Sequence, residues 1–334
     1  MNTTGLMKYA PALVVLAICS ACGGASAVAP SSTALNGQYI GRTYAVDGML
    51  TTAARPNLNP LPRYVPIVPD RHKKSKTFEY VINDYGTYAG IFDYPKSDKQ
   101  IGTINNVGGQ GCTNVLYGYG KKTFWIVAGT DQITEYKVPQ KPIKTLSVAS
   151  GEPSSCAMDT SGDLAVGNLS NGQVVIFKNA SGSGTVFPTS LAREYFDGYD
   201  NQGNLFADGF TNGSQFELIE LPNGGSAFQT ITTSNTIEFP GSVQWDGTYL
   251  TVFDQLANAM YQYTVSGTKA KLKGTISFKE SSDCAQTWIA TGVVFCADAG
   301  NENGAVFNYP AGGTPIAIFT GNFDLPLGTV AAEK

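Results

Sequence analysis

A strand-like pattern recurs six times along this 334-residue chain from Phe78 onward. In each unit an apolar segment ends in Asp or Asn, and a Gly- or Asn-rich turn leads into a second segment that ends in aromatic residues. The end points keep a steady spacing: Asp84 and Asn168 lie two periods of 42 residues apart, and Asp208, Asp254 and Asp298 follow at steps of 40, 46 and 44. A repeat of about 42 residues holds four short strands, which is one blade of a β-propeller.

The repeats therefore predict an all-β chain folded as a six-bladed β-propeller of four-stranded repeats. The alternation within each unit has the period of strands, which excludes helical repeats of similar length. A single blade cannot bury both faces of its sheet, so blades must stack in a ring. The first repeat lacks the leading strand that the others have, and residues 323–330 are a spare strand. We expect this C-terminal strand to complete the first blade and close the ring, which removes an exposed sheet edge.

Composition agrees with this class and argues against nucleic-acid binding. Only 14% of residues are charged, 38 are glycine, and the formal net charge is −4. A nucleic-acid partner would require a strongly basic face. The one basic run, at 71–76, is interpreted as a solvated junction before the repeats. We expect the repeats to occupy 77–334 and to follow a Pro-rich tail or linker at 28–76, which is either a stalk or a strap along the rim.

Residues 1–27 are typical of an export signal. Lys8 precedes an apolar run at 10–21 that is too short to span a bilayer comfortably. The segment 19–24 is similar to a bacterial lipobox, although Cys19 stands where leucine is usual, and it predicts acylation of Cys22. Cleavage after Ala27 is the alternative, because 25–27 reads A-S-A. The first product is a membrane-anchored lipoprotein of the cell envelope and the second is secreted; we favour the first.

The repeats resemble the NHL/SMP-30-like superfamily of six-bladed propellers over 78–330. The segment 159–166 (D-T-S-G-D-L-A-V) is similar to the D-x-x-G-N-L-x-V element of those families, and 200–205 is close to it. The resemblance implies the fold more than the function. In SMP-30-like lactonases a calcium ion sits in the central channel, held by Glu, Asn and Asp from different blades. Those ligands have no residue-by-residue counterpart in this chain.

Four cysteines lie within the repeats, and an even number in an exported protein favours disulfides. Cys284 and Cys296 flank a predicted hairpin that turns at 290–292, so they can face each other across one blade. Cys112 and Cys156 occupy matching places on the first strands of consecutive blades, which can approach each other near the axis. A metal site is the weaker alternative because these four cysteines include no C-x-x-C pair.

The single histidine, His72, precedes the repeats. A Ser-His-Asp hydrolase and a histidine-rich metal site are therefore disfavoured. The recurring carboxylates offer one alternative, since hard oxygen ligands suit calcium. Asp208, Asp254 and Asp298 are weak candidates for such a site. The favoured interpretation is that they cap tight turns by accepting hydrogen bonds from nearby backbone N–H groups.

These observations lead to three functional hypotheses. The first is an exported, lipid-anchored propeller that acts as a non-catalytic binding scaffold, without a cofactor, for a glycan, a peptide or another envelope protein. The second is a divalent-metal lactonase or lyase, and the third is a structural envelope component. Three or more oxygen ligands gathered at the channel mouth would favour the enzyme, whereas an apolar or plugged channel would favour the scaffold.

Overall fold

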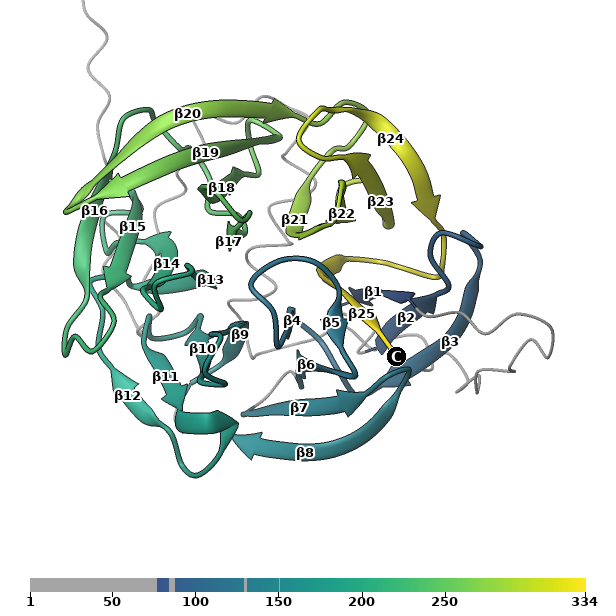
Figure 1. The fold of residues 1–334 in the computed structure, drawn as a ribbon, viewed down its shortest axis with the longest axis horizontal. Coiled ribbons are helices and arrows are strands. Elements are labelled where there is room, and N and C mark those ends of the chain that lie inside the picture. Colours follow the sequence, from purple (N-terminus) through teal and green to yellow (C-terminus); the bar gives the residue numbers. More distant parts are fainter. Residues whose placement is uncertain (1–76, 84–87, 129–130, 150) are drawn as a thin grey trace, which may run out of the picture. The chain divides into compact units, whose positions relative to one another are not determined.

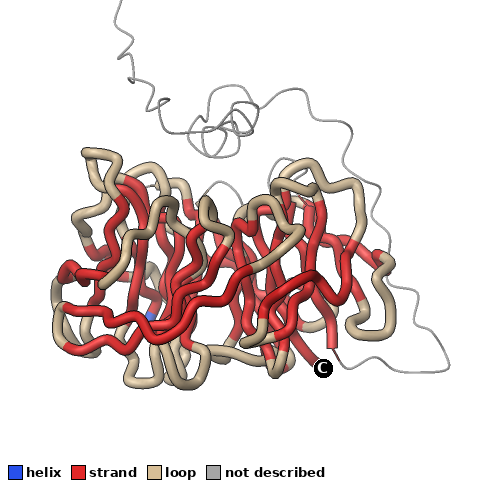
Figure 2. Tube along the Cα trace, turned by 90° about the horizontal axis from the view of Figure 1, so that it is seen from above, coloured by secondary structure: helices blue, strands red, loops and turns tan. Residues whose placement is uncertain are grey.

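The computed structural model describes residues 77–83, 88–128, 131–149 and 151–334. These residues form short β-strands grouped in sheets that radiate from a central axis, as Figure 1 shows. Seen from the side, the strands run through the thickness of the ring and the turns lie at its two faces (Figure 2). The described part of the chain is thus a propeller-like arrangement of sheets. Cys22, the export signal and the Pro-rich tail lie outside the described residues.

Five sheets are formed within the described ranges. The first has the order β3-β2-β1-β25-β5, with bounds Gln100–Asn105, Tyr88–Phe92, Thr77–Asn83, Pro326–Glu333 and Gly120–Lys121. The second is β4-β6-β7-β8, with bounds Gly111–Thr113, Thr123–Val127, Gln132–Lys137 and Lys141–Ser147. The third is β12-β11-β10-β9, with bounds Thr185–Phe187, Val174–Phe177, Leu164–Asn168 and Pro153–Met158; the 3-10 turn η1, Lys178–Ala180, follows β11.

The fourth sheet has eight strands and the fifth has four. The fourth reads β13 (Arg193–Tyr199), β14 (Leu205–Phe210), β15 (Phe216–Leu221), β16 (Gln229–Thr233), β20 (Lys269–Ser277), β19 (Ala259–Ser266), β18 (Leu250–Asp254) and β17 (Val243–Trp245). The fifth reads β21 (Cys284–Ala290), β22 (Val293–Asp298), β23 (Asn303–Asn308) and β24 (Gly312–Phe319).

The eight-stranded sheet is two antiparallel runs joined at their outer strands. Only the short parallel pairing of Thr232 and Thr233 with Lys269 and Ala270 links β16 to β20. Single parallel bridges join outer strands in the same way at two further junctions, Phe278 with Gly313 and Lys99 with Thr320. The number of sheets in this ring is therefore not the same as the number of blades.

The C-terminal strand completes the first sheet, as predicted. β25 pairs antiparallel with β1, with Val330 opposite Tyr80 and Thr329 opposite Val81. The strand spans Pro326–Glu333, so it lies about three residues further along than the 323–330 expected from sequence. Asn83 adds a second tie, because its Oδ1 accepts hydrogen bonds from the backbone N–H groups of Asp324 (3.0 Å) and Leu325 (2.8 Å).

The D-x-x-G elements form the turns between first and second strands. Oδ1 of Asp159 accepts hydrogen bonds from the N–H groups of Ser161 (2.9 Å) and Asp163 (2.7 Å), and Gly162 has φ of +96°. Asp200 repeats this geometry one sheet further on, accepting from Gln202 (2.8 Å) and Asn204 (2.9 Å). The side chain supplies the turn's acceptor and glycine supplies the left-handed backbone, so this sequence element predicts a tight hairpin.

Aromatic side chains fill the wedges between neighbouring sheets. The rings of Tyr80 and Phe124 lie 4.1 Å apart, and those of Phe92 and Phe319 lie 4.7 Å apart. All four side chains are fully or almost fully buried. The hydrophobic core is thus divided among the sheet-to-sheet interfaces, which leaves the innermost strands β4, β9, β13, β17, β21 and β25 to line the axis (Figure 1).

Candidate functional site

The recurring carboxylates are engaged with backbone. Asp254 accepts hydrogen bonds from the N–H groups of Glu238 (2.9 Å) and Phe239 (3.3 Å), in the segment that leads into β17. Asp298 accepts hydrogen bonds of 3.1 to 3.3 Å from the N–H groups of Ser282 and Asp283, which precede β21. The same carboxylates also make the tight-turn contacts that the sequence interpretation favoured, because Asp254 accepts from the N–H groups of Leu256 (3.1 Å) and Ala257 (3.2 Å) and Asp298 accepts from that of Asn301 (3.1 Å).

Asp208 is also buried, and Oδ2 accepts a 3.3 Å hydrogen bond from the N–H of Gly241. Burial raises the pKa of the Asp208 carboxyl well above its usual value. Among the described residues, no group of three or more His, Cys, Asp or Glu side chains is arranged to hold a metal ion. Asp84 lies outside the described residues.

Glutamine side chains cross-brace the channel between the innermost strands. Gln110 donates from Nε2 to the carbonyl oxygen of Tyr195, at 2.7 Å. Gln286 donates to the carbonyl oxygen of Gly111 (2.8 Å) and accepts from the N–H groups of Gly111 (3.1 Å) and Thr329 (2.7 Å). These two amides therefore link backbone groups of chain segments that are far apart in sequence.

The connection between β4 and β5, residues 114–119, enters the centre of the ring (Figure 1); we call it the plug loop. The carbonyl oxygen of Leu116 accepts a 3.0 Å hydrogen bond from Nε2 of Gln244. Gly118 donates its N–H to the carbonyl oxygen of Ile289 (2.9 Å) and accepts from Nε1 of Trp288 (2.7 Å). These bonds fasten the plug loop to the far side of the channel mouth.

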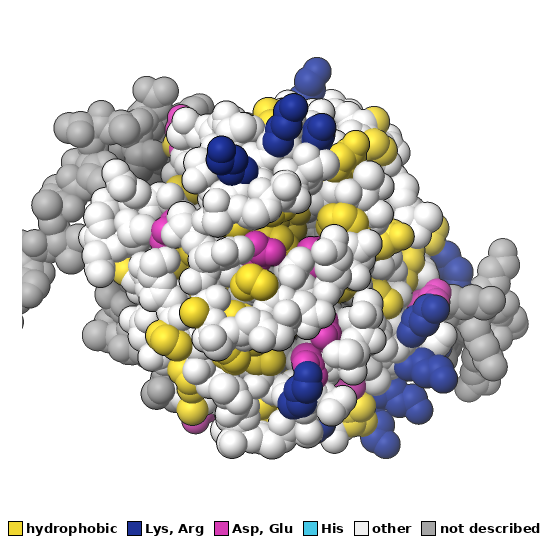
Figure 3. All heavy atoms as spheres, turned by 60° about the vertical axis from the view of Figure 1, so that its left-hand side comes forward, with side chains coloured by type: hydrophobic (Ala, Val, Ile, Leu, Met, Phe, Trp, Pro, Cys, Tyr) yellow, Lys and Arg dark blue, Asp and Glu magenta, His cyan; other side chains and the backbone are white. Residues whose placement is uncertain are grey.

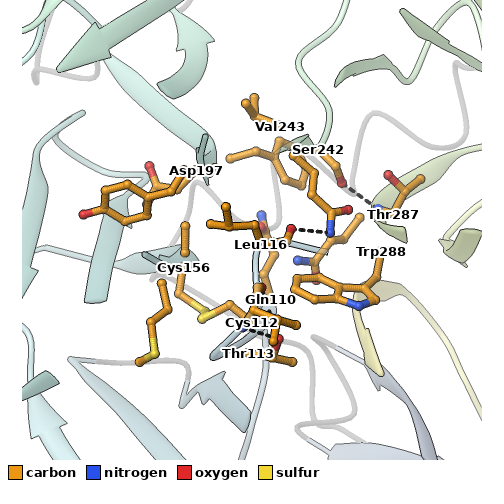
Figure 4. A pocket seen from close by; sticks show the side chains of 18 residues that line it. Gln110, Cys112, Thr113, Leu116, Cys156, Asp197, Ser242, Val243, Thr287 and Trp288 are labelled. Atoms are coloured by element: carbon orange, nitrogen blue, oxygen red, sulfur yellow. Dashed lines mark hydrogen bonds between the residues drawn. A yellow bond between two sulfur atoms is a disulfide. The ribbon is translucent and has the colours of Figure 1, made fainter. Parts of the chain in front are cut away.

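The plug loop leaves a narrow pocket beneath it (Figure 4). Its volume is about 410 Å³ including space open to solvent, but the centre of a water molecule can reach only about 30 Å³ of it. A cavity of that size holds one or a few water molecules. It is lined by Gln110, Cys112, Thr113, Val115, Leu116, Cys156, Ala157, Met158, Phe196, Asp197, Gly198, Tyr199, Ser242, Val243, Gln244, Gln286, Thr287 and Trp288.

Both predicted disulfides are confirmed. Cys112 and Cys156 join β4 to β9 in the wall of the pocket, with Cα atoms 5.7 Å apart. Cys284 and Cys296 join the two strands of the β21–β22 hairpin, with Cα atoms 5.4 Å apart. A register shift between Cys284 and Thr287 moves the two cysteines out of direct opposition.

A pair of carboxyl groups is buried between β13 and β9. Oγ of Ser155 lies 2.9 Å from Oε1 of Glu194 and 3.1 Å from Oδ2 of Asp197, so one hydroxyl serves both acids. Gly167 makes room for them, because a Cβ there would lie 1.7 Å from Oε2 of Glu194. Burial raises the pKa of Glu194 well above its usual value, and raises that of Asp197 to about 7.

A second and wider concavity opens between the third sheet and β13–β16. We call it the interblade groove. Its volume is about 740 Å³ with space open to solvent included. It is lined by Asp159, Asp163, Ile176, Lys178, Thr185, Phe187, Tyr199, Gly203, Leu205, Leu221, Pro222, Asn223, Gly224 and Gly225. Tyr199 lines both the pocket and the groove, so the two concavities are neighbours on one face of the ring.

Sequence reasoning placed the cysteines correctly and missed the polar braces. Gln244 lies on β17 and Gln286 on β21, which are the first strands of their antiparallel runs. A long amide on such a strand is a signal that could have been noticed. The length of 114–119 between two short strands is a second signal, because the equivalent turns at 159–163 and 200–204 are tight.

No family model and no curated protein matches this chain. Among solved structures, a protein provisionally assigned as a 6-phosphogluconolactonase, from Bacteroides uniformis, is similar over 75% of this chain and 84% of its own, with 10% identity and a TM-score of 0.50. A functionally unknown protein from Desulfotomaculum acetoxidans matches 77% of this chain and 88% of its own, with 13% identity and a TM-score of 0.49. At these identities the likeness concerns the β-propeller fold alone.

Proposed function

We propose that this protein is a non-catalytic binding propeller of the bacterial cell envelope, and that it binds its partner on the face that carries the plug loop. The observation that carries the proposal is the closed channel mouth. The plug loop is fastened across it through Gly118 and Leu116, and the space beneath holds only water-sized groups. A hydrolase or lyase of this fold would need an open pocket with reactive groups aimed into it.

The carboxylates support the same conclusion. Asp254 and Asp298 each accept several backbone hydrogen bonds, so their role in the loops is structural. Glu194 is fully buried and hydrogen bonded to Ser155. Asp197 shares that hydroxyl and lines the narrow pocket, whose accessible space is sized for water.

We further infer that the ring has six blades, as in NHL/SMP-30-like propellers. The eight-stranded sheet then counts as two blades, β13–β16 and β17–β20, joined by the outer parallel pairing. The same outer bridges recur between other neighbouring sheets, which supports treating this pairing as a junction. With the remaining four sheets the count is six.

The two disulfides support export, because such bonds persist mainly in oxidising compartments. No helix among the described residues is long and apolar enough to cross a membrane. We propose that acylated Cys22 supplies the membrane attachment. Two signals are normally needed for stable anchoring by lipid, and a multiply acylated cysteine supplies them at one residue.

The function is tested by assaying the purified full-length protein against a panel of lactones and aryl esters, with and without calcium. We expect no turnover above that of the buffer. The matched variants Asp208→Asn, Asp254→Asn and Asp298→Asn serve as probes, with circular dichroism to check folding. Turnover that is abolished by a chelator and by one of these variants, without loss of fold, would overturn the proposal in favour of a metal enzyme.

A further inference from the structure

The interblade groove has apolar walls that are already in place. Ile176 and Phe187 form one side, and Leu205, Leu221 and Pro222 form the other. The turn that ends the groove is fixed by Asn223, whose N–H donates to Oδ1 of Asn204 (3.0 Å) and whose Nδ2 donates to the carbonyl oxygen of Gln202 (2.8 Å). A groove that is preformed in this way loses little entropy when it binds a ligand.

Part of the groove is acidic. Asp159 and Asp163 line it, and Asp197 lines the neighbouring pocket. Burial raises the pKa of Tyr199 above its usual value, and Asp159, Asp197 and Asp163 raise it further. Figure 3 turns this side of the ring forward: hydrophobic and acidic side chains show in the middle of the view, and most Lys and Arg side chains lie toward its upper and right-hand edges.

The chain's own Lys178 shows that the acidic part of the groove accepts a cation. Its Nζ lies 2.6 Å from Oδ2 of Asp163, and the N–H of Asn179 holds the other carboxylate oxygen at 2.9 Å. The Lys178 side chain is 80% exposed and that of Asp163 is 11% exposed, so the pair joins a solvent-exposed cation to a largely buried carboxylate. A cation brought by a partner can take the place of the exposed ammonium on Asp163.

We propose that the interblade groove binds an arginine side chain of a polypeptide partner, flanked in the partner's chain by apolar residues. The aliphatic stem would lie along the apolar walls, while the guanidinium would reach Asp159 and Asp163. Arginine suits the site better than lysine, because its planar head can bond oxygens of two carboxylates at the same time. The apolar walls extend beyond one side chain, which accounts for the flanking residues. This inference rests on the proposed binding function and assigns it a partner class.

The probe is a fluorescently labelled peptide, Gly-Leu-Arg-Leu-Pro-Gly, titrated with the full-length protein and followed by anisotropy. We expect saturable binding that is lost when citrulline, which is neutral and nearly isosteric, replaces arginine. Asp163→Asn should weaken binding by at least about tenfold, since a charge-assisted hydrogen bond is lost. Lys178→Ala should tighten binding by about threefold, because it removes the competing ammonium.

Lys269→Ala is the matched control, since Lys269 lies on β20, outside the groove lining, and its loss changes the net charge equally. Equal tightening by Lys269→Ala and Lys178→Ala would overturn the proposal in favour of bulk electrostatics. Equal binding of the citrulline peptide, or no binding of either peptide, would also overturn it. Those results leave the closed channel and the absence of turnover untouched, so they are distinguishable from failure of the proposed function.

Discussion

Glu194 and Asp197 are both hydrogen bonded to one hydroxyl, that of Ser155, across the interface between β13 and β9. Two acids this close in a buried site cannot both ionise freely. The pair therefore retains a proton in the folded protein at pH values where the unfolded chain has lost it.

The first prediction concerns pH. Burial raises the pKa of Asp197 to about 7 and that of Glu194 well above its usual value. Well below about pH 4 both the folded and the unfolded state hold the protons, so the two carboxyls do not lower the free energy of unfolding. As pH rises toward 7 the unfolded state ionises first, and the free energy of unfolding falls by at most about 1.4 kcal/mol per pH unit for each group. Urea unfolding at pH 5 and pH 8 measures the difference.

Glu194→Gln isolates this contribution. The variant should be more stable than the wild type at pH 8, on the order of 1 kcal/mol, and should lose most of that advantage at pH 5. Glu238→Gln is the matched control, since Glu238 is exposed and should leave the pH dependence unchanged. A Glu194→Gln profile parallel to that of the wild type would contradict the assignment.

The disulfides are predicted to stabilise the ring unequally. Cys112–Cys156 closes a loop of 44 residues and Cys284–Cys296 one of 12. Loop-closure entropy then gives about 4 kcal/mol for the first and about 3 kcal/mol for the second. Double alanine variants of each pair, compared by chemical unfolding, measure the two losses. Non-reducing peptide mapping checks the pairing, and free thiols in the oxidised wild type would refute it.

Ring closure depends on Val330 in β25, whose side chain is fully buried and packs on Gly111. Val330→Ala should lower the free energy of unfolding by about 2 kcal/mol, because it leaves a cavity between the first and last parts of the chain. Val186→Ala makes the same chemical change at a 40% exposed site and should cost far less. Equal losses for the two variants would argue against closure by β25.

The plug loop is held by the indole N–H of Trp288, which bonds to the carbonyl oxygen of Gly118. Trp288→Phe removes that donor, and we expect amide hydrogen exchange in 114–119 to accelerate by about fivefold. Trp245→Phe is the control, because Trp245 has no equivalent bond to the plug loop. Exchange that stays at the wild-type rate would show that Gln244 and Ile289 suffice to hold the loop.

Cys22 is predicted to carry the lipid. Cys22→Ala should move the protein from the membrane fraction to the soluble fraction on cell fractionation, because removal of the acyl chains removes the apolar anchor. Mass spectrometry of the wild type gives an independent answer. A mature protein that begins at Val28 would assign the leader to the ordinary secretion route.

The sequence by itself determined the features that repeat or pair locally. Strand alternation at a 42-residue period requires stacked sheets, the two D-x-x-G turns indicate where their hairpins reverse, and the missing first strand calls for a C-terminal replacement. Cys112 and Cys156 occupy matching positions in consecutive repeats, which meet near the axis, and Cys284 and Cys296 flank a single hairpin. Only the tertiary structure decided what fills that axis. Gln110 reaches Tyr195, and Gln286 reaches Gly111, across 85 and 175 residues of chain. Such contacts depend on strand tilt, on register shifts such as that between Glu194 and Phe196, and on the path of the plug loop. None of these has a local signature, because each arises where separate sheets converge on one small space.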